Sequence, residues 1–229
     1  ITPVLTMRIL AEEKKNKTDQ LLLTSPVPVW KIVLGKYLGM VTIYLIPVLI
    51  AGLYPFILSK YGTVSYSMAF TATIGFFFLG CANLSIGLFL SSITESQVIA
   101  AVLTFAALFC SFMMNGIESF FSQTAITSMM AFLVLAVVAA VFVYQMTKDN
   151  LLTGITGIVL AGIVLIVYFV KSSLYEGAIQ KLLDLLAVTN HFDNFVGGIL
   201  DLTGIVYMLS VICIFVFLTI QSIQKRRWS

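Results

Sequence analysis

The sequence predicts an all-α protein, a polytopic bundle of transmembrane helices with six spans and one cytoplasmic hairpin. The first observation is composition: 60% of the 229 residues are hydrophobic and 10% are charged, whereas soluble domains have roughly 45–50% apolar and about 25% charged residues. The second is distribution, because the apolar residues gather in runs of twenty or more without a charge. A helix of that length crosses about 30 Å of hydrocarbon.

Six apolar runs carry the predicted spans. All Lys, Arg, Asp and Glu residues and the single His lie outside them. A backbone inside a bilayer must satisfy its own hydrogen bonds, so uninterrupted runs of this length indicate helices rather than barrel strands. The runs are Leu38–Leu58, Ser67–Ser91, Gln97–Ile117, Ala125–Thr147, Leu151–Val170 and Thr203–Ile223.

The remaining segments complete a single predicted transmembrane domain over residues 1–229. Residues 1–7 have the character of the end of a further apolar helix, so we expect the chain to be a fragment that lacks its N-terminus. Residues 8–37 form the predicted hairpin, 38–223 the six spans, and 171–202 an external segment. The three cysteines lie inside apolar runs and are interpreted as small hydrophobic residues; they are Cys81, Cys110 and Cys213.

The basic residues predict the orientation. If the hairpin is cytoplasmic, ten of the 13 Lys and Arg residues lie on the cytoplasmic side, including Lys148 and the C-terminal Lys225–Arg227. Only Lys60, Lys171 and Lys181 lie outside. The positive-inside rule therefore selects this orientation, which also places the C-terminus in the cytoplasm.

The hairpin is the most informative part of the sequence. Thr18 is a candidate N-cap for a short helix over Asp19–Thr24, and Pro26 should stop that helix. We expect Pro28 to occupy the first turn of the next helix, which leads into the membrane. Two interpretations of the leucines at 21–23 follow from composition alone. Either a soluble partner grips them and tilts the attached helices, or they dip into the lipid headgroups.

Three motifs give the chain a family resemblance. They are Pro3-x-Leu-Thr-Met-Arg-x-Leu-Ala-Glu-Glu-Lys14, Thr18-x-x-Leu-Leu-Leu-Thr-Ser-Pro-Val27 and Ile32-Val-Leu-Gly-Lys36. With these motifs the chain resembles the ABC-2 family of ABC transporter permeases, and within it the gliding-motility (GldF-like) branch. The C-terminal part, from His191 to Trp228, fits as well. The family usually has Gly before the Thr of the second motif, where this chain has Lys17; Lys adopts a positive φ only at a cost.

The resemblance implies a permease subunit in a bacterial inner membrane that couples ATP hydrolysis to substrate export. ATP would be hydrolysed by a separate ABC ATPase subunit, and a second permease copy or homologue would complete the membrane part. Glu12 and Glu13 would begin the cytoplasmic loop. The coupling helix that docks on the ATPase would comprise Thr18, Asp19, Gln20, Leu21, Leu22, Leu23, Thr24, Ser25 and Pro26.

Several motifs are absent from the sequence. It has no Gly-x-x-x-x-Gly-Lys-Ser/Thr phosphate loop, no His-Glu-x-x-His and no Gly-x-Ser-x-Gly, so we expect no enzyme activity, cofactor or metal in this chain. No nucleic-acid partner is expected. Spans without Asp, Glu, Lys, Arg or His disfavour an ion-coupled carrier. A non-transport membrane scaffold or sensor that docks a cytoplasmic partner remains the alternative.

Three smaller features carry expectations. An amphipathic helix over Ala178–Leu186 should lie on the outer membrane surface, and Gly197-Gly198 should let the chain turn before the last span. His191 is interpreted as a solvated surface residue. Gly35-x-x-x-Gly39 permits close contact between helices, although chance explains such a pattern equally well.

Overall fold

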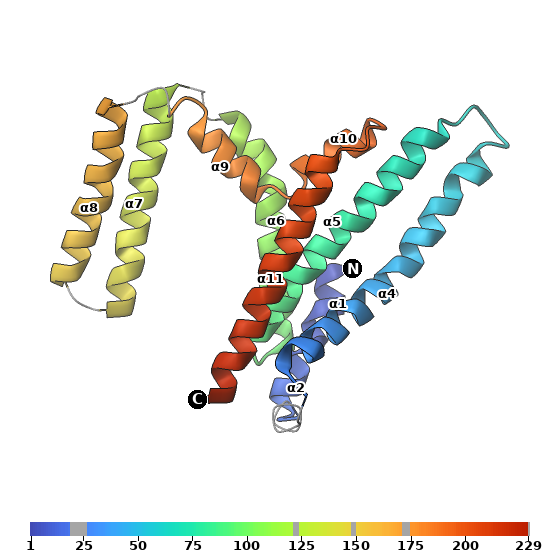
Figure 1. Cartoon of the computed structure of the whole chain (residues 1–229), viewed down its shortest axis with the longest axis horizontal. Coiled ribbons are helices and arrows are strands. Elements are labelled where there is room, and N and C mark those ends of the chain that lie inside the picture. The colour runs from blue at the N-terminus through green and yellow to red at the C-terminus, as the bar shows by residue number, and fades with distance from the viewer. Residues whose placement is uncertain (19–26, 121–123, 148–149, 171–174, 229) are drawn as a thin grey trace. The chain divides into compact units, whose positions relative to one another are not determined.

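The computed structural model describes residues 1–18, 27–120, 124–147, 150–170 and 175–228. Every regular element within these ranges is a helix, which confirms the all-α class (Figure 1). The elements are α1 (Thr2–Ile9), α2 (Ala11–Lys15), α4 (Val29–Leu58), α5 (Tyr66–Ile93), α6 (Gln97–Phe120), α7 (Ala125–Thr147), α8 (Asn150–Val170), α9 (Ala178–Leu186), the 3-10 turn η2 (Asn190–Phe192), α10 (Asp193–Val196) and α11 (Leu202–Trp228).

Each of the six predicted spans corresponds to one helix. Four of these helices are long and apolar enough to cross a membrane within the described ranges: α4, α5, α6 over Gln97–Met114 and α11 over Leu202–Lys225. The helices α7 and α8 contain shorter apolar stretches, Ala125–Val138 and Gly157–Tyr168. The predicted bundle of membrane helices is therefore confirmed.

Helix α4 begins at Val29, close to the start expected for the helix that leads from Pro28 into the membrane, and continues through the predicted span at Leu38–Leu58. Pro28 precedes the helix as its N-cap, with φ −66° and ψ 140°, and does not lie in the first turn as expected. The proline ring fixes φ near −66°. Because the ψ of Pro28 is extended and not helical, the helix begins at the next residue, Val29. The helix continues through Pro47 and Pro55.

The described helices form two compact units. The first comprises residues 1–112 and 188–229, and the second comprises residues 113–187. In the second unit α7 packs against α8 and α9. The ring of Tyr175 meets those of Phe132 and Tyr168 edge to face, and its hydroxyl donates to the carbonyl of Val164 at 3.0 Å. Helix α9 has the bounds predicted from its amphipathic pattern, Ala178–Leu186.

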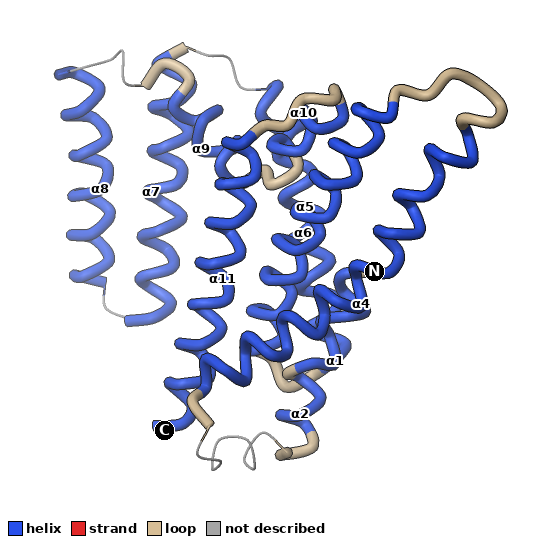
Figure 2. The backbone as a smooth tube through the Cα atoms, turned by 45° about the vertical axis from the view of Figure 1, so that its right-hand side comes forward, coloured by secondary structure: helices blue, strands red, loops and turns tan. Residues whose placement is uncertain are grey.

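Helix α5 is the centre of the first unit and packs against α1, α4, α10 and α11 (Figures 1 and 2). Three of its glycines receive side chains from three other elements. Phe195 of α10 lies against Gly75, Tyr44 of α4 against Gly80, and Thr6 of α1 against Gly87. A Cβ atom on any of these glycines would overlap the incoming side chain. The absence of side chains at these positions therefore lets the helices approach closely.

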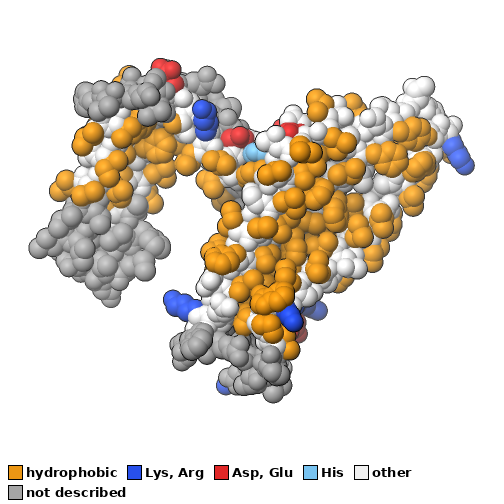
Figure 3. All heavy atoms as spheres, in the orientation of Figure 1, with side chains coloured by type: hydrophobic (Ala, Val, Ile, Leu, Met, Phe, Trp, Pro, Cys, Tyr) orange, Lys and Arg blue, Asp and Glu red, His pale blue; other side chains and the backbone are white. Residues whose placement is uncertain are grey.

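Two clusters of buried apolar residues hold the first unit together. One joins α4, α5 and α11 and contains Val33, Tyr37, Met40, Leu84 and Val216 among others. The other joins α5 to α11 through Leu79, Ile86 and Met208. Outside these clusters, hydrophobic side chains cover much of the visible face of this unit, and Lys and Arg side chains lie toward the helix ends (Figure 3). This distribution is what a lipid-facing surface requires.

The segment before α11 folds back onto α5. Phe195 is fully buried, and its carbonyl accepts a hydrogen bond from the Thr71 hydroxyl at 3.2 Å. Gly198 has φ +83°, which confirms the predicted turn.

His191 is half-buried, and so it is only in part the solvated surface residue that the sequence suggested. Its ring stacks on Tyr207 with centroids 3.8 Å apart, and its Nδ1 is buried without a hydrogen-bond partner in the described part of the chain. The cause is the packing of η2 against both α5 and α11.

The Gly35-x-x-x-Gly39 pattern makes no close helix contact among the described residues. A Cβ atom at either glycine would meet nothing within 4 Å. Both positions are exposed on α4.

Candidate coupling site

Helix α2 is the first helix that lies wholly within the predicted hairpin; it has five residues and follows α1 almost directly. Glu12 and Glu13 lie in its first turn, and Lys14 and Lys15 lie in its last turn. This order suits the helix dipole, which favours acidic side chains at the N-terminus and basic ones at the C-terminus. Ala11, the first residue of α2, is fully buried.

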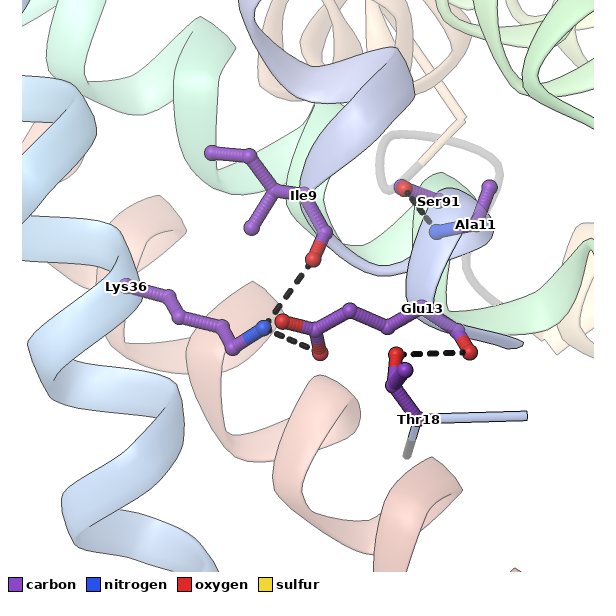
Figure 4. Close-up of polar contacts among 6 residues, drawn as sticks. All are labelled: Ile9, Ala11, Glu13, Thr18, Lys36 and Ser91. Carbon is purple, nitrogen blue, oxygen red and sulfur yellow. Dashed lines mark hydrogen bonds and ion pairs between the residues drawn. The ribbon is translucent and has the colours of Figure 1, made fainter. Parts of the chain in front are cut away.

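Lys36 joins α2 to α4. Its ammonium group forms an ion pair with the carboxylate of Glu13 and donates a hydrogen bond to the carbonyl of Ile9 at 3.0 Å (Figure 4). The Lys36 and Glu13 side chains are 18% and 30% exposed, so water screens this pair less than it would a fully exposed pair. One side chain of α4 thus holds the end of α1 and the start of α2.

The end of α5 holds the other side of α2. The backbone N–H of Ala11 donates to the hydroxyl of Ser91 at 3.2 Å (Figure 4). This N–H is one of the first four of its helix and has no acceptor within that helix. The ammonium group of Lys14 in addition donates to the carbonyl of Ser92. Helix α2 is therefore fastened to both α4 and α5.

Helix α2 ends in a Schellman motif. The N–H of Thr18 donates to the carbonyl of Glu13 at 3.0 Å, and the N–H of Lys17 donates to that of Lys14 at 3.1 Å. Lys17 has φ +57°, the only positive φ of a non-glycine residue in the described ranges. Glycine is the usual residue at this position of the motif. The structure thus explains why the resemblance places glycine where this chain has Lys17.

The predicted coupling residues are only partly within the described ranges. Glu12, Glu13 and Thr18 are described, and the Thr18 hydroxyl donates to the carbonyl of Glu13 at 3.3 Å. The predicted short helix with its leucines lies outside them, from Asp19 through Gln20, Leu21, Leu22, Leu23, Thr24 and Ser25 to Pro26. Lys148 and Lys171, two of the basic residues that predict the orientation, also lie outside the described residues.

Sequence reasoning did not find Lys36, Ser91 or Ser92 as partners of α2. Lys36 was visible only as a basic residue near a span, and the serines as small polar residues at the end of another. No sequence signal pairs residues this far apart in a single chain. No group of three His, Cys, Asp or Glu side chains close enough to hold a metal ion occurs among the described residues.

The fold and the site define a multi-pass membrane protein of helices in which a short hairpin is fastened to two spans. A model of the ABC-2 family transporter proteins matches residues 1–127, which is more than half of the chain and includes α1, α2, α4 and α5. The chain therefore belongs to the ABC-2 family, whose members are the membrane components of ABC transporters and associate with an ABC ATPase. No curated protein and no solved structure matches the sequence.

Proposed function

We propose that this chain is the permease subunit that couples ATP hydrolysis in a separate ATPase subunit to substrate export. The observation that carries the proposal is the double attachment of α2, through Lys36 to α4 and through Ser91 and Ser92 to α5. A partner that moves the hairpin would thereby move the ends of two spans together.

The packing of α5 supports transmission further into the membrane. Helix α5 packs against α11 and α10 as well as α4, and Gly75 and Gly80 receive Phe195 and Tyr44 without a gap. Packed elements of this kind shift as units because their interiors have little free volume. A displacement at Ser91 would therefore reach Phe195 near the opposite end of α5.

The rest of the assignment extends the family membership. Residues 19–26 would form the coupling helix that docks on the ATPase, and a second permease copy or homologue would complete the pathway. The ten-to-three bias of basic residues supports a cytoplasmic hairpin and C-terminus. The motif between Pro3 and Lys14 supports the gliding-motility (GldF-like) branch and a bacterial inner membrane.

Co-purification of the ATPase tests the proposal. We would express the permease together with its ATPase, introduce Leu22→Asp, and measure ATPase retained per permease after affinity purification. Leu200→Asp is the matched control, because Leu200 is 58% exposed in the loop before α11. Size-exclusion profiles would establish that both variants stay folded.

We expect Leu22→Asp to release the ATPase and Leu200→Asp to retain it. Equal retention by a folded Leu22→Asp variant would contradict the coupling-helix assignment and favour leucines that lie in the lipid headgroups. Failure of the native chain to retain any ATPase would favour a scaffold or sensor.

A further inference from the structure

An open groove of about 480 Å³ lies between α4 and the segment formed by α1 and α2. Its α4 wall includes Lys36, Gly39 and Ile43, which are spaced by three and four residues and so share one helix face. Its other wall includes Arg8, Glu12 and Glu13. All of these residues belong to the first compact unit.

The groove changes from charged to apolar along α4. Lys36 lies at one end and Ile43 at the other, about 10 Å further along the helix at 1.5 Å per residue. Between them Gly39 contributes no side chain, and a Cβ atom there would meet nothing within 4 Å. Ile43 is 54% exposed and faces outward. Such a surface fits a molecule with a polar head and an alkyl chain.

The charged side chains of the groove indicate which polar head group the bound molecule would carry. Lys36 is neutralised by Glu13, whereas no ion pair or side-chain hydrogen bond reaches Arg8 or Glu12 from the described residues. Arg8 offers a guanidinium group, which binds phosphate in a bidentate manner. Glu12 offers a carboxylate, which accepts hydrogen bonds from an ammonium group. With two charges of each sign, the groove matches a zwitterion better than an anion.

We propose that this groove binds phosphatidylethanolamine from the membrane leaflet on the hairpin side. Its phosphate would lie at Arg8, its primary ammonium group at Glu12, and an acyl chain along Gly39 and Ile43. A choline head has no N–H to donate to Glu12, and its usual binding site is a cage of aromatic rings. None of the described residues that line the groove is aromatic. A bound lipid would stabilise the ion pair between Glu13 and Lys36.

Lipid retention by the assembled transporter tests this proposal. The permease–ATPase complex would be equilibrated in nanodiscs with equal amounts of phosphatidylethanolamine, phosphatidylcholine and phosphatidylglycerol, and then extracted in mild detergent. Mass spectrometry would count the retained lipids. Gly39→Leu fills the groove, and Gly35→Leu is its control one turn away, where a Cβ atom also meets nothing within 4 Å. Glu12→Gln removes the negative charge that would pair with the ammonium group, with Glu95→Gln as its control.

We expect the native complex and both controls to enrich phosphatidylethanolamine over phosphatidylcholine. Gly39→Leu should lose the retained lipid, and Glu12→Gln should reduce the enrichment about tenfold, as expected for the loss of one charge-assisted contact. Equal retention by Gly39→Leu and Gly35→Leu would overturn the site. A preference for phosphatidylglycerol, or an enrichment unchanged by Glu12→Gln, would overturn the assignment of an ethanolamine head group. Retention only after the ATPase is stripped away would show that the ATPase covers the groove, and would overturn the proposal too.

Discussion

The carboxylate of Glu13 pairs with the ammonium group of Lys36, which fixes the start of the hairpin to the second turn of α4 (Figure 4). The same ammonium group holds the carbonyl of Ile9, the last residue of α1. The elements α1, α2 and α4 therefore meet at one side chain. If the hairpin receives force from an ATPase, this contact is where the force enters α4.

The first prediction concerns the attachment of α2 to α5. Ser91→Ala should lower the free energy of unfolding by about 1–3 kcal/mol, because it leaves the buried N–H of Ala11 without an acceptor. Ser92→Ala is the matched control. Among the described residues its hydroxyl bonds only to the carbonyl of Phe89 in its own helix, and the carbonyl that binds Lys14 is kept. Thermal unfolding in detergent checks this, and an equal loss for both serines would contradict it.

The second prediction concerns the strained backbone at Lys17. Lys17→Gly should stabilise the protein by about 0.5–1 kcal/mol, because glycine adopts φ +57° without the steric penalty of a Cβ atom. Lys15→Gly, within α2, should destabilise by about 1 kcal/mol. Melting temperatures of the two variants should thus shift in opposite directions. A decrease for Lys17→Gly would show that the left-handed conformation is not adopted in the membrane-bound protein.

The third prediction concerns the contact of α5 with α10. A Cβ atom on Gly75 would lie 2.5 Å from Cγ of Phe195, so Gly75→Ala should destabilise by about 1–3 kcal/mol through overpacking. Gly35→Ala, with open space around it, should instead stabilise by about 0.5–1 kcal/mol, because alanine favours a helix interior over glycine. Phe195→Leu combined with Gly75→Ala should recover part of the loss. Thermal melts that show no such recovery would mean that Phe195 is not the residue displaced.

The fourth prediction concerns pH. The hydrogen bond from the Asn194 side chain to Asp201, at 2.8 Å, lowers the pKa of the Asp201 carboxyl, with further help from the N–H of Thr203. A lowered pKa in the folded state gives a stabilisation that is present above about pH 4 and is lost as the pH falls through the folded value. Asp201→Asn should therefore melt at a lower temperature than the native chain at pH 7, with the difference shrinking toward pH 3. A difference independent of pH would contradict this account.

Much of the fold follows from the sequence, because a bilayer imposes length and apolarity on each span. The same one-dimensional signal predicted α9, whose bounds agree from Ala178 to Leu186. The turn at Gly198 was predictable too, since glycine favours a positive φ. These features depend on residues that are neighbours in the chain.

The features that sequence reasoning missed depend on residues far apart. Lys36 with Glu13, Ala11 with Ser91 and His191 with Tyr207 meet only because helices pack side by side. Hydropathy carries no information on which helix faces which. The positive φ at Lys17 is a local feature that the sequence indicated only in part. The resemblance pointed to the position, and the Schellman motif supplied the physical reason.

A charge exchange between Glu13 and Lys36 tests whether this ion pair carries force from the hairpin into α4. We would measure the permease-dependent ATPase rate of the reconstituted complex for Glu13→Lys, for Lys36→Glu and for both together, with Lys31→Glu as a control on the exposed face of α4. If the pair carries force from the hairpin to α4, each single reversal should lower the rate at unchanged ATPase content. The double exchange should then exceed either single variant, and the control should match the native complex. A coupling role for this ion pair would be contradicted if the single reversals left the ATPase rate unchanged. It would also be contradicted if the double exchange gave a rate no higher than the slower single variant.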